Sequence, residues 1–154
     1  FLEDDWFHDQ DPIDWAKAHR FRGILKMYRQ LVHLRRNVAG QTRGLCGQHV
    51  HVHHVNNRDK VIAYHRWDRG GPQDDVVVVV NTANCSYDRY TIGFPRPGTW
   101  KVRLNSDWRG YDPMFGDRAS PDTLAQTGVK DGMPCWGDVG IGAYSAVILS
   151  QDKD

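Results

Sequence analysis

The feature that most constrains this chain is a run of five consecutive valines, residues 76–80, preceded by two aspartates. A strand with one wet face alternates apolar and polar residues, whereas an unbroken β-branched run needs apolar cover on both faces. The run therefore predicts a central strand that is covered on both sides of its sheet. A chain of 154 residues is long enough to form one domain with a core of that kind.

Shorter strand patterns lie before and after the valine run. Residues 49–55 alternate histidine with valine, residues 60–67 alternate between two faces, and a turn sequence, Asn-Asn-Arg-Asp, separates them. These two segments predict a hairpin. Further strands are expected at residues 89–94, 99–105 and 140–149. The segment between Ser106 and Gly137 has little periodicity, and a loop of that length usually has a function or contains short strands.

One amphipathic helix is expected before the strands, within residues 18–37. Six apolar residues recur at the spacing of one helix face: Phe21, Ile24, Leu25, Tyr28, Leu31 and Val32. Arg35 and Arg36 fall in the last turn, where cations favour the negative end of the helix dipole. The helix should span about 18 residues and needs a surface to pack against. The whole pattern predicts a mostly β fold, an antiparallel sandwich or barrel preceded by this helix.

Composition excludes some classes of partner. The net charge is +1 with neutral histidines, which gives no reason to expect nucleic acid or an anionic membrane as a partner. No apolar run approaches the roughly 20 residues that cross a bilayer. The acidic, aromatic start lacks an initiator methionine and the features of a signal peptide, which is typical of a piece of a longer protein or of a processed product.

The cysteine pattern bears on the compartment. Cys46, Cys85 and Cys135 are sparse and odd in number, so they do not form a disulfide framework. We expect reduced thiols in a cytoplasmic protein, because the cytosol keeps cysteines reduced. One disulfide with one free thiol is the alternative.

Residues 46–54 hold one cysteine and four histidines, which raises the question of a metal site. The candidate ligands are Cys46, His49, His51 and His53. Second neighbours on a strand are about 7 Å apart and can share a Zn²⁺ ion, so one hypothesis is a zinc or copper site. The other hypothesis is the polar face of an edge strand, with Val50 and Val52 facing the core. No acidic residue in the segment is placed to orient the imidazoles, which favours the polar face.

The sequence lacks the motifs of several enzyme classes. It has no G-x-S-x-G, no P-loop and no dinucleotide-binding glycine motif followed by a helix. Its acidic clusters fit solvated loops and helix caps better than a glycosidase pair. Four aromatic residues fall in the irregular segment: Trp108, Tyr111, Phe115 and Trp136. These aromatics are candidates for stacking on sugar rings, and the alternative is a satellite core beneath a long loop.

Long segments of the chain match one known pattern. The start, FLEDDWFHDQDPIDW, is followed by FRGILKMYRQLVHLRRN, and together they resemble the last loop and helix of the α-amylase-family catalytic barrel. The segment VVVVVNTANCSYDRYTIGFPRPGTWKVRLNSD, with KVIAYHRW before it and GAYSAVIL after it, resembles the all-β C-terminal domain of that family. It is most similar to 1,4-α-glucan branching enzymes. The resemblance implies the tail of a (β/α)8 barrel at residues 1–40 and an antiparallel β-sandwich at residues 45–151.

The resemblance also implies a function and a partner. The parent enzyme would cleave an α-1,4 bond in glycogen or starch and transfer the glucan chain to a 6-hydroxyl, without a cofactor. The catalytic carboxylates of the family follow earlier barrel strands, so no residue of this chain is assigned a catalytic role. The family holds no metal at the strand that corresponds to residues 49–55. The apolar helix face, which normally packs on the barrel, is expected to cover the sandwich or a second copy, which would give a homodimer.

Candidate glucan contacts follow from the same resemblance. The barrel loop near the substrate cleft contains Trp6, which joins Trp108, Tyr111 and Trp136 as a candidate. Two departures leave the subfamily open. Thr82 stands where the family usually has an apolar residue, and residues 112–136 match none of its patterns. An α-amylase or a trehalose-type hydrolase or isomerase is therefore the alternative parent.

Overall fold

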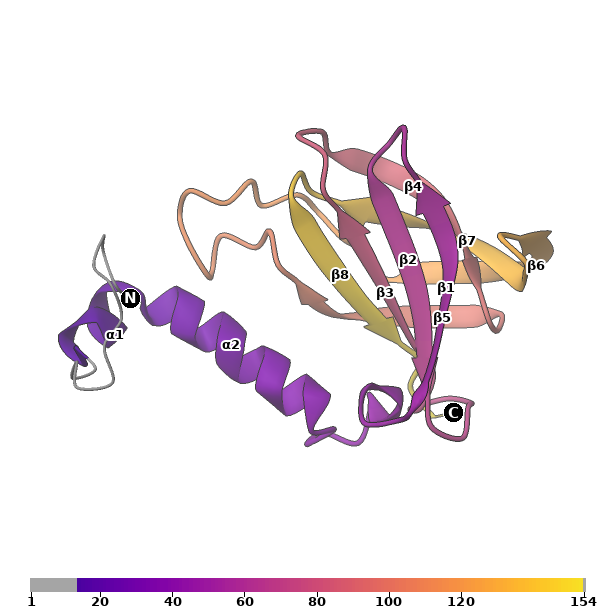
Figure 1. The fold of residues 1–154 in the computed structure, drawn as a ribbon, viewed down its shortest axis with the longest axis horizontal. Helices are drawn as coiled ribbons and strands as arrows, with labels where there is room; N and C mark the ends of the chain where they lie inside the picture. Colours follow the sequence, from indigo (N-terminus) through magenta and orange to yellow (C-terminus); the bar gives the residue numbers. More distant parts are fainter. Residues whose placement is uncertain (1–13, 154) are drawn as a thin grey trace.

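Figure 1 shows the computed structural model of the protein, which describes residues 14–153. The chain begins with α1 (Ala16–Arg20), α2 (Arg22–Arg35) and the 3-10 turn η1 (Arg43–Leu45). The strands are β1 (His49–Asn56), β2 (Val61–Trp67), β3 (Val76–Asn81), β4 (Tyr87–Phe94), β5 (Gly98–Asn105), β6 (Thr123–Lys130), β7 (Met133–Ile141) and β8 (Ser145–Ser150). Between residues 14 and 153, neither helix is long and apolar enough to span a membrane.

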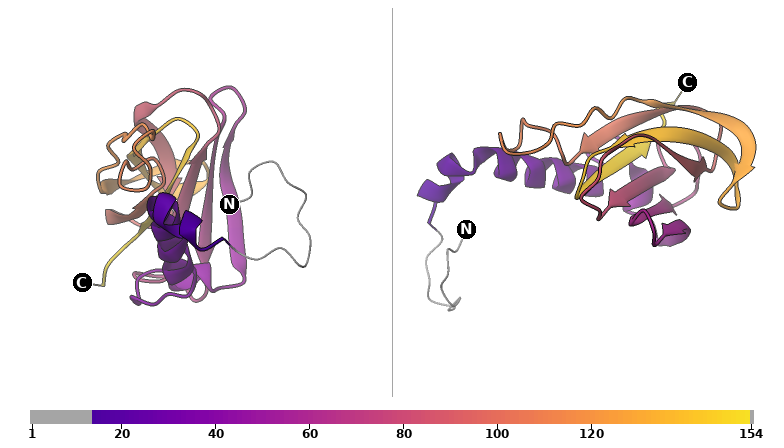
Figure 2. Two further views of the ribbon diagram at one scale, coloured as in Figure 1. Left: turned by 90° about the vertical axis from the view of Figure 1, so that its left-hand side faces the viewer. Right: turned by 90° about the horizontal axis from the view of Figure 1, so that it is seen from above.

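The strands form one antiparallel sheet in the order β1-β2-β3-β8-β5-β6-β7-β4. Strand β5 changes partner along its length, because residues 98–100 pair with β6 whereas most of residues 101–105 pair with β8. The sheet therefore folds over at β5 into a first layer, β1-β2-β3-β8-β5, and a second layer, β6-β7-β4 (Figure 2). This arrangement is the predicted antiparallel sandwich, preceded by the predicted helix. The main helix, α2, spans 14 residues rather than about 18, because Phe21 separates it from the 5-residue α1.

The valine run forms β3 in the middle of the first layer, between β2 and β8. Val77 and Val79 are fully buried in the core between the two layers. Val76 and Val78 are buried on the opposite side of the sheet, against Leu45 and its neighbours. The predicted central strand with apolar cover on both faces is confirmed.

The main core fills the space between the layers. Its largest fully buried side chains are Trp100, Phe94, Ile92, Ile141 and Leu149. The Trp100 ring lies 5.1 Å from the Phe94 ring, and its indole N–H donates a hydrogen bond of 3.1 Å to the Arg96 carbonyl oxygen. This core therefore holds the two layers together and satisfies the polar edge of its largest aromatic residue.

Two strands lie in the segment that shows little periodicity in the sequence. Strand β6 and the first half of β7 fall between Ser106 and Gly137. The alternative that this segment contains short strands is therefore confirmed. Residues 106–122 remain irregular and extend alongside α2 (Figure 1).

Helix α2 packs on the outer surface of the first layer. Leu31 and Leu34 contact the outer cluster around Val76 and Val78. None of the residues of α2 is fully buried, and Tyr28 remains 59% exposed. The helix is thus covered by the β domain on one side only.

Candidate functional site

The histidine-rich strand β1 forms an edge of the first layer, and its orientation is the reverse of the prediction. The expectation that Val50 and Val52 face the core is wrong, because they are 59% and 52% exposed on the outer surface. Pairing with β2 sets this orientation. His51 lies opposite His65, which shares the inward side of β2 with Ala63. The histidines therefore face inward along the open edge of the sandwich.

The proposed metal ligands are not brought together. The Cys46 thiol is exposed and donates a hydrogen bond of 2.9 Å to the carbonyl oxygen of Arg35. His49 stacks on Trp67 with the ring centroids 5.2 Å apart, and the His51 and His53 rings are 6.1 Å apart. Within residues 14–153, no group of three His, Cys, Asp or Glu side chains is placed to hold a metal ion. All three cysteines of the chain are free thiols.

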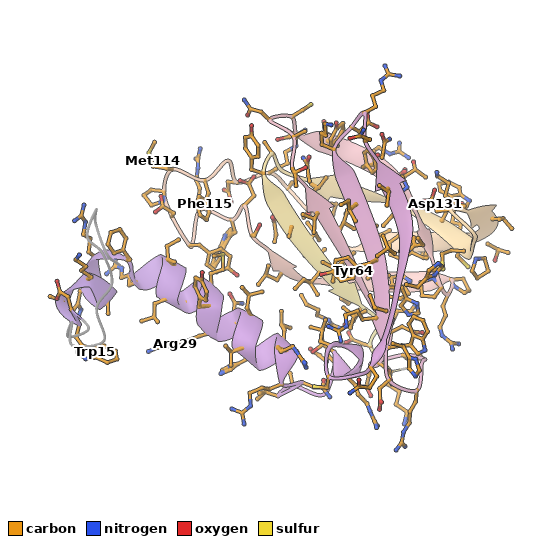
Figure 3. All side chains as sticks on the ribbon, in the orientation of Figure 1. Trp15, Arg29, Tyr64, Met114, Phe115 and Asp131 are labelled. Atoms are coloured by element: carbon orange, nitrogen blue, oxygen red, sulfur yellow. The ribbon has the colours of Figure 1, made fainter. Side chains whose placement is uncertain are left out.

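His54 connects the first layer to the second. A bulge between Val52 and His54 turns the His54 ring toward the β6–β7 turn, where Asp131 lies (Figure 3). The His54 Nδ1 is 3.0 Å from an Asp131 carboxylate oxygen, and its Nε2 is 3.1 Å from the Tyr90 hydroxyl. Burial alone would raise the pKa of Asp131, but contacts with Lys130 and His54 lower it. The hydrogen-bond partners and the burial of this cluster indicate a structural role, in which it joins the two layers.

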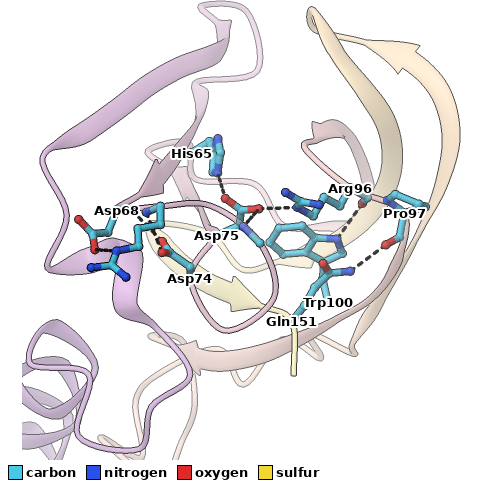
Figure 4. Close-up of polar contacts among 10 residues, drawn as sticks. His65, Asp68, Asp74, Asp75, Arg96, Pro97, Trp100 and Gln151 are labelled. Atoms are coloured by element: carbon cyan, nitrogen blue, oxygen red, sulfur yellow. Dashed lines mark hydrogen bonds and ion pairs between the residues drawn. The ribbon is translucent and has the colours of Figure 1, made fainter. Parts of the chain in front are cut away.

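A second polar cluster that joins separate elements is centred on Asp75, just before β3 (Figure 4). One carboxylate oxygen is 2.9 Å from His65 Nε2, and the other accepts hydrogen bonds of 2.9 Å from Arg96 Nε and the Gly71 N–H. Burial alone would raise the pKa of Asp75, but these hydrogen bonds lower it. The carboxylate therefore stays charged and joins β2 to the turn between β4 and β5.

Two of the predicted aromatic contacts lie where residues 106–122 meet α2. Tyr111 is only 5% exposed, and its hydroxyl donates a hydrogen bond to the Gln30 side-chain oxygen. Trp108 is 41% exposed, but the Lys26 ammonium lies 4.1 Å from its ring centroid. Tyr111 also contacts the Trp108 ring edge-on, at 5.0 Å between centroids. These aromatics hold α2 against residues 106–122, and their role as glucan contacts stays a prediction.

Trp136 lies elsewhere, on the outer face of the second layer. It is partly exposed on β7 and lines a depression with a volume of about 350 Å³. Gln126 on β6 and Asp138 on β7 line the same depression. Sequence reasoning did not single out Gln126 and Asp138, because β6 and β7 were not recognised as strands. Hydrophobicity gives no signal for β6, because the polar Thr123 is buried whereas the apolar Leu124 is 62% exposed.

Phe115 lines a different depression, beside the tip of the irregular segment (Figure 3). That depression has a volume of about 270 Å³ and is shared with Met114 and Tyr144, which are 89% and 69% exposed. Tyr144 is an aromatic residue that sequence reasoning did not single out. Trp6 lies outside the described residues. The predicted glucan contacts thus divide between the α2 junction and the Trp136 depression.

A comparison with family models identifies the fold class of the β domain. The family described as "Alpha amylase, C-terminal all-beta domain" matches residues 51–152. The match begins within β1 and ends just beyond β8, so it covers the sandwich and stops short of α2.

Comparison with curated proteins finds branching enzymes from plants and bacteria. A 1,4-alpha-glucan-branching enzyme 2-2, chloroplastic/amyloplastic, from Arabidopsis thaliana is 31% identical over 121 residues, which are 75% of this chain and 13% of the relative. The 1,4-alpha-glucan branching enzyme GlgB of Vibrio parahaemolyticus is 25% identical over 70% of this chain and 14% of its own length. That of Photobacterium profundum is 29% identical over 70% of this chain and 15% of its own length. The chain thus spans 13–15% of the length of these relatives.

Proposed function

The chain belongs to the family of α-amylase C-terminal all-β domains, and from this premise we propose that it is the C-terminal part of a longer α-glucan-acting enzyme. We call this longer polypeptide the parent enzyme and propose that it is a 1,4-α-glucan branching enzyme. The similarity to plant and bacterial 1,4-α-glucan branching enzymes supports this choice of activity. In this proposal residues 1–40 are the end of the catalytic barrel and residues 45–151 are the C-terminal domain.

The parent enzyme would catalyse glycosyl transfer in two steps. In the first, an enzyme carboxylate attacks the anomeric carbon, the α-1,4 bond breaks, and a carboxylic acid protonates the departing 4-hydroxyl. In the second, the 6-hydroxyl of an acceptor chain gives its proton to the same acid–base residue and attacks the glycosyl ester, which releases the carboxylate. We assign no residue of this chain to either step and propose a stabilising role for it.

The observation that carries this proposal is the two-sided character of α2. Gly23, Leu31 and Leu34 face the β domain, and Gly23 lies so close to it that a Cβ there would overlap a backbone carbonyl of residues 106–122. Tyr28 and Val32 fall on the opposite side of the helix and are 59% and 50% exposed. A helix that is apolar on opposite sides is typical of a helix buried between two bodies. The second body would be the catalytic barrel.

Product analysis tests the proposed activity of the parent enzyme. We expect it to convert linear amylose into a product with new α-1,6 linkages, measured as short linear chains released by a debranching enzyme. The number of reducing ends before debranching should stay constant, because each α-1,4 bond broken is replaced by one α-1,6 bond. Residues 1–154 alone are the control and should change neither quantity.

Two other outcomes would overturn this assignment. New reducing ends without α-1,6 linkages would identify a hydrolase of the α-amylase type. Release or interconversion of trehalose would identify a trehalose-type enzyme. Both are the alternative parents left open by Thr82 and by the unmatched residues 112–136.

A further inference from the structure

The depression around Trp136 is not explained by a stabilising role. Its volume of about 350 Å³ lies within the range of about 300–1,000 Å³ that is typical of ligand sites. Its lining comes from every strand of the second layer, with Arg89 on β4, Gln126 on β6, and Trp136 and Asp138 on β7. This face of the sandwich is turned away from α2, which packs on the first layer (Figure 2). Neither the helix nor residues 106–118 cover it.

Trp136 supplies an apolar surface with one unused polar group. It lies opposite Gln126 in the register of β6 and β7. Gly128, two residues further along β6, allows the indole to lie close to the strand, because a Cβ there would be 2.9 Å from the ring. Within residues 14–153, the Trp136 indole N–H has no hydrogen-bond acceptor and is not a buried unsatisfied group. The indole therefore offers an apolar face and a donor to a ligand.

Asp138 supplies a carboxylate that is already held in place. The Thr91 hydroxyl donates a hydrogen bond of 2.6 Å to one of its oxygens, and Arg89 Nε donates one of 2.9 Å to the other. The hydrogen bond from Thr91 lowers the pKa of Asp138 against the opposing effect of burial, and Arg89 lowers it further. Arg89 Nη2 donates a further hydrogen bond of 2.6 Å to the same oxygen as Nε, so both lone pairs of that oxygen are used. The oxygen bound by Thr91 keeps a free lone pair and is an oriented acceptor for ligand hydroxyls at neutral pH.

We propose that Trp136, Gln126 and Asp138 bind a chain of α-1,4-linked glucose units on the outer face of the second layer. The apolar C–H face of a glucose ring packs on the indole, since aromatic side chains bury large apolar areas without a deep pocket. Glucose hydroxyls donate to Asp138 and to the Gln126 carbonyl oxygen, and the Gln126 amide donates in return. The identity of the sugar as an α-glucan rests on the proposed function.

The other exposed aromatics are less suited to this role. The Trp108 ring face is covered by the Lys26 ammonium, and Tyr111 is buried. Tyr144 is exposed, but it lies in the turn before β8 and lines the other depression. It therefore serves as a matched control, an exposed aromatic residue of the same chain outside the proposed site.

Nuclear magnetic resonance of residues 1–154 tests the proposal. The indole N–H signals are recorded while maltoheptaose, an α-1,4 glucan, is added, and the Trp136 signal is assigned from the spectrum of Trp136→Phe. We expect the Trp136 signal to shift with saturation and the Trp108 signal to stay fixed. Cellohexaose, which has β-1,4 linkages, should bind at least about tenfold more weakly, a difference of about 1.4 kcal/mol.

Binding of the same sugar to variants separates the site from a folding effect. Gln126→Ala changes an exposed side chain and should weaken maltoheptaose binding several-fold without altering the unfolding midpoint. Trp136→Ala should abolish binding, and Tyr144→Ala should leave it unchanged. A Trp136 signal that does not move, or binding lost in Tyr144→Ala and kept in Gln126→Ala, would overturn the proposal.

Failure of this inference and failure of the proposed function give different results. The proposed glucan site at Trp136 is tested by sugar binding to residues 1–154, whereas the parent activity is tested by the linkages of the product. A parent enzyme that forms α-1,6 linkages, together with residues 1–154 that do not bind maltoheptaose, would overturn the glucan site alone. Equal binding of maltoheptaose and cellohexaose would overturn the choice of an α-glucan as ligand.

Discussion

At the scale of single residues, the buried Asp75 carboxylate connects three segments of the fold. It is 3% exposed and accepts hydrogen bonds from His65, Arg96 and the backbone of Gly71. The next residue back, Asp74, accepts hydrogen bonds of 2.7 and 2.8 Å from the backbone N–H groups of residues 68 and 69. The two aspartates before the valine run thus fix the loop before β3 and join it to the second layer (Figure 4).

Asp75→Asn should lower the free energy of unfolding by about 2 kcal/mol at pH 7, because an amide leaves one buried donor without an acceptor. The pKa of Asp75 lies below its ordinary value of 3.8 in the folded protein. Its charge therefore stabilises the fold above pH 3.8, and that contribution is lost as the pH falls through the folded-state pKa. Urea unfolding from pH 7 to pH 2 should show the difference between the two proteins narrowing at the acid end.

A matched control for this prediction is Asp68→Asn. Asp68 pairs with Arg43 through side chains that are 36% and 43% exposed. Exposed ion pairs contribute less than about 1 kcal/mol, so this variant should change the unfolding free energy little at any pH. A loss in Asp75→Asn no larger than in Asp68→Asn, or one independent of pH, would contradict the role given to the buried carboxylate.

At the scale of elements, α2 depends on a few close contacts. Gly23 lies against the backbone carbonyl of Tyr111, whose hydroxyl donates a hydrogen bond to Gln30 about two turns further along the helix. At the other end of the helix, the Thr42 hydroxyl donates a hydrogen bond of 2.8 Å to the Leu34 carbonyl oxygen. The helix is therefore held at both ends, with leucine side chains packed between.

Gly23→Ala should loosen α2, although alanine normally favours a helix over glycine by about 1 kcal/mol. The added Cβ overlaps a carbonyl oxygen of the backbone, so the helix or residues 106–118 must move. We expect limited proteolysis within α2 to become about tenfold faster, equivalent to about 1.4 kcal/mol of local stability. Arg29→Ala, on the exposed side of α2, is the control and should not change the rate. Slower cleavage of Gly23→Ala would contradict the close contact.

The sequence predicts the elements in which buried apolar residues follow a regular spacing. The valines of β3 need cover on both faces, and the alternation of β2 matches its burial. On β5 a register shift between Val102 and Leu104 leaves Trp100 in the core between the layers and puts Leu104 in the outer cluster. Strands β6 and β7 were missed because Gly128, Pro134 and Gly137 interrupt their pattern. Gly137 is required by packing rather than by a turn, since a Cβ there would lie 2.6 Å from the Thr123 side chain.

The orientation of β1 shows what a local pattern does not determine. Histidine alternates with valine, and hydrophobicity alone puts Val50 and Val52 inside. Pairing with β2 and the bulge between Val52 and His54 determine the orientation instead, and they let His49 stack on Trp67 and His54 contact Asp131. The Trp136 depression was likewise predicted only in part. The aromatic residue stood out in the sequence, but its polar neighbours appear only when β4, β6 and β7 lie side by side.

At the scale of the whole molecule, two groups of exposed apolar residues lie on the first layer and on α2. The first-layer edge exposes Val50, Val52 and Val55 by 52–68%. On α2, Tyr28 and Val32 are exposed by 59% and 50%. Tyr28 and Val32 are one helical turn apart, and neighbouring exposed apolar side chains of this kind mark an interaction surface. We propose that the barrel of the parent enzyme covers the α2 part of it.

Residues 1–154 alone should therefore self-associate through α2. Sedimentation should show a mass that rises with concentration, because a second copy can cover Tyr28 and Val32 in place of the barrel. Tyr28→Lys combined with Val32→Lys should remain monomeric at every concentration. Val129→Lys, on a residue that is 85% exposed on β6, is the control and should associate like the original chain. Association that persists in the double variant would contradict an interface at α2.

The most direct test of the central claim, that α2 is buried between two bodies, compares the same double variant in two settings. Unfolding by urea is measured for the parent enzyme and for residues 1–154 at a concentration where the chain is monomeric. We expect Tyr28→Lys with Val32→Lys to lower the free energy of unfolding of the parent enzyme by several kcal/mol, because the two charges would be buried against the barrel. In residues 1–154 alone the same change should alter it by less than about 0.5 kcal/mol. Equal stability of the parent with and without the two lysines would contradict the central claim.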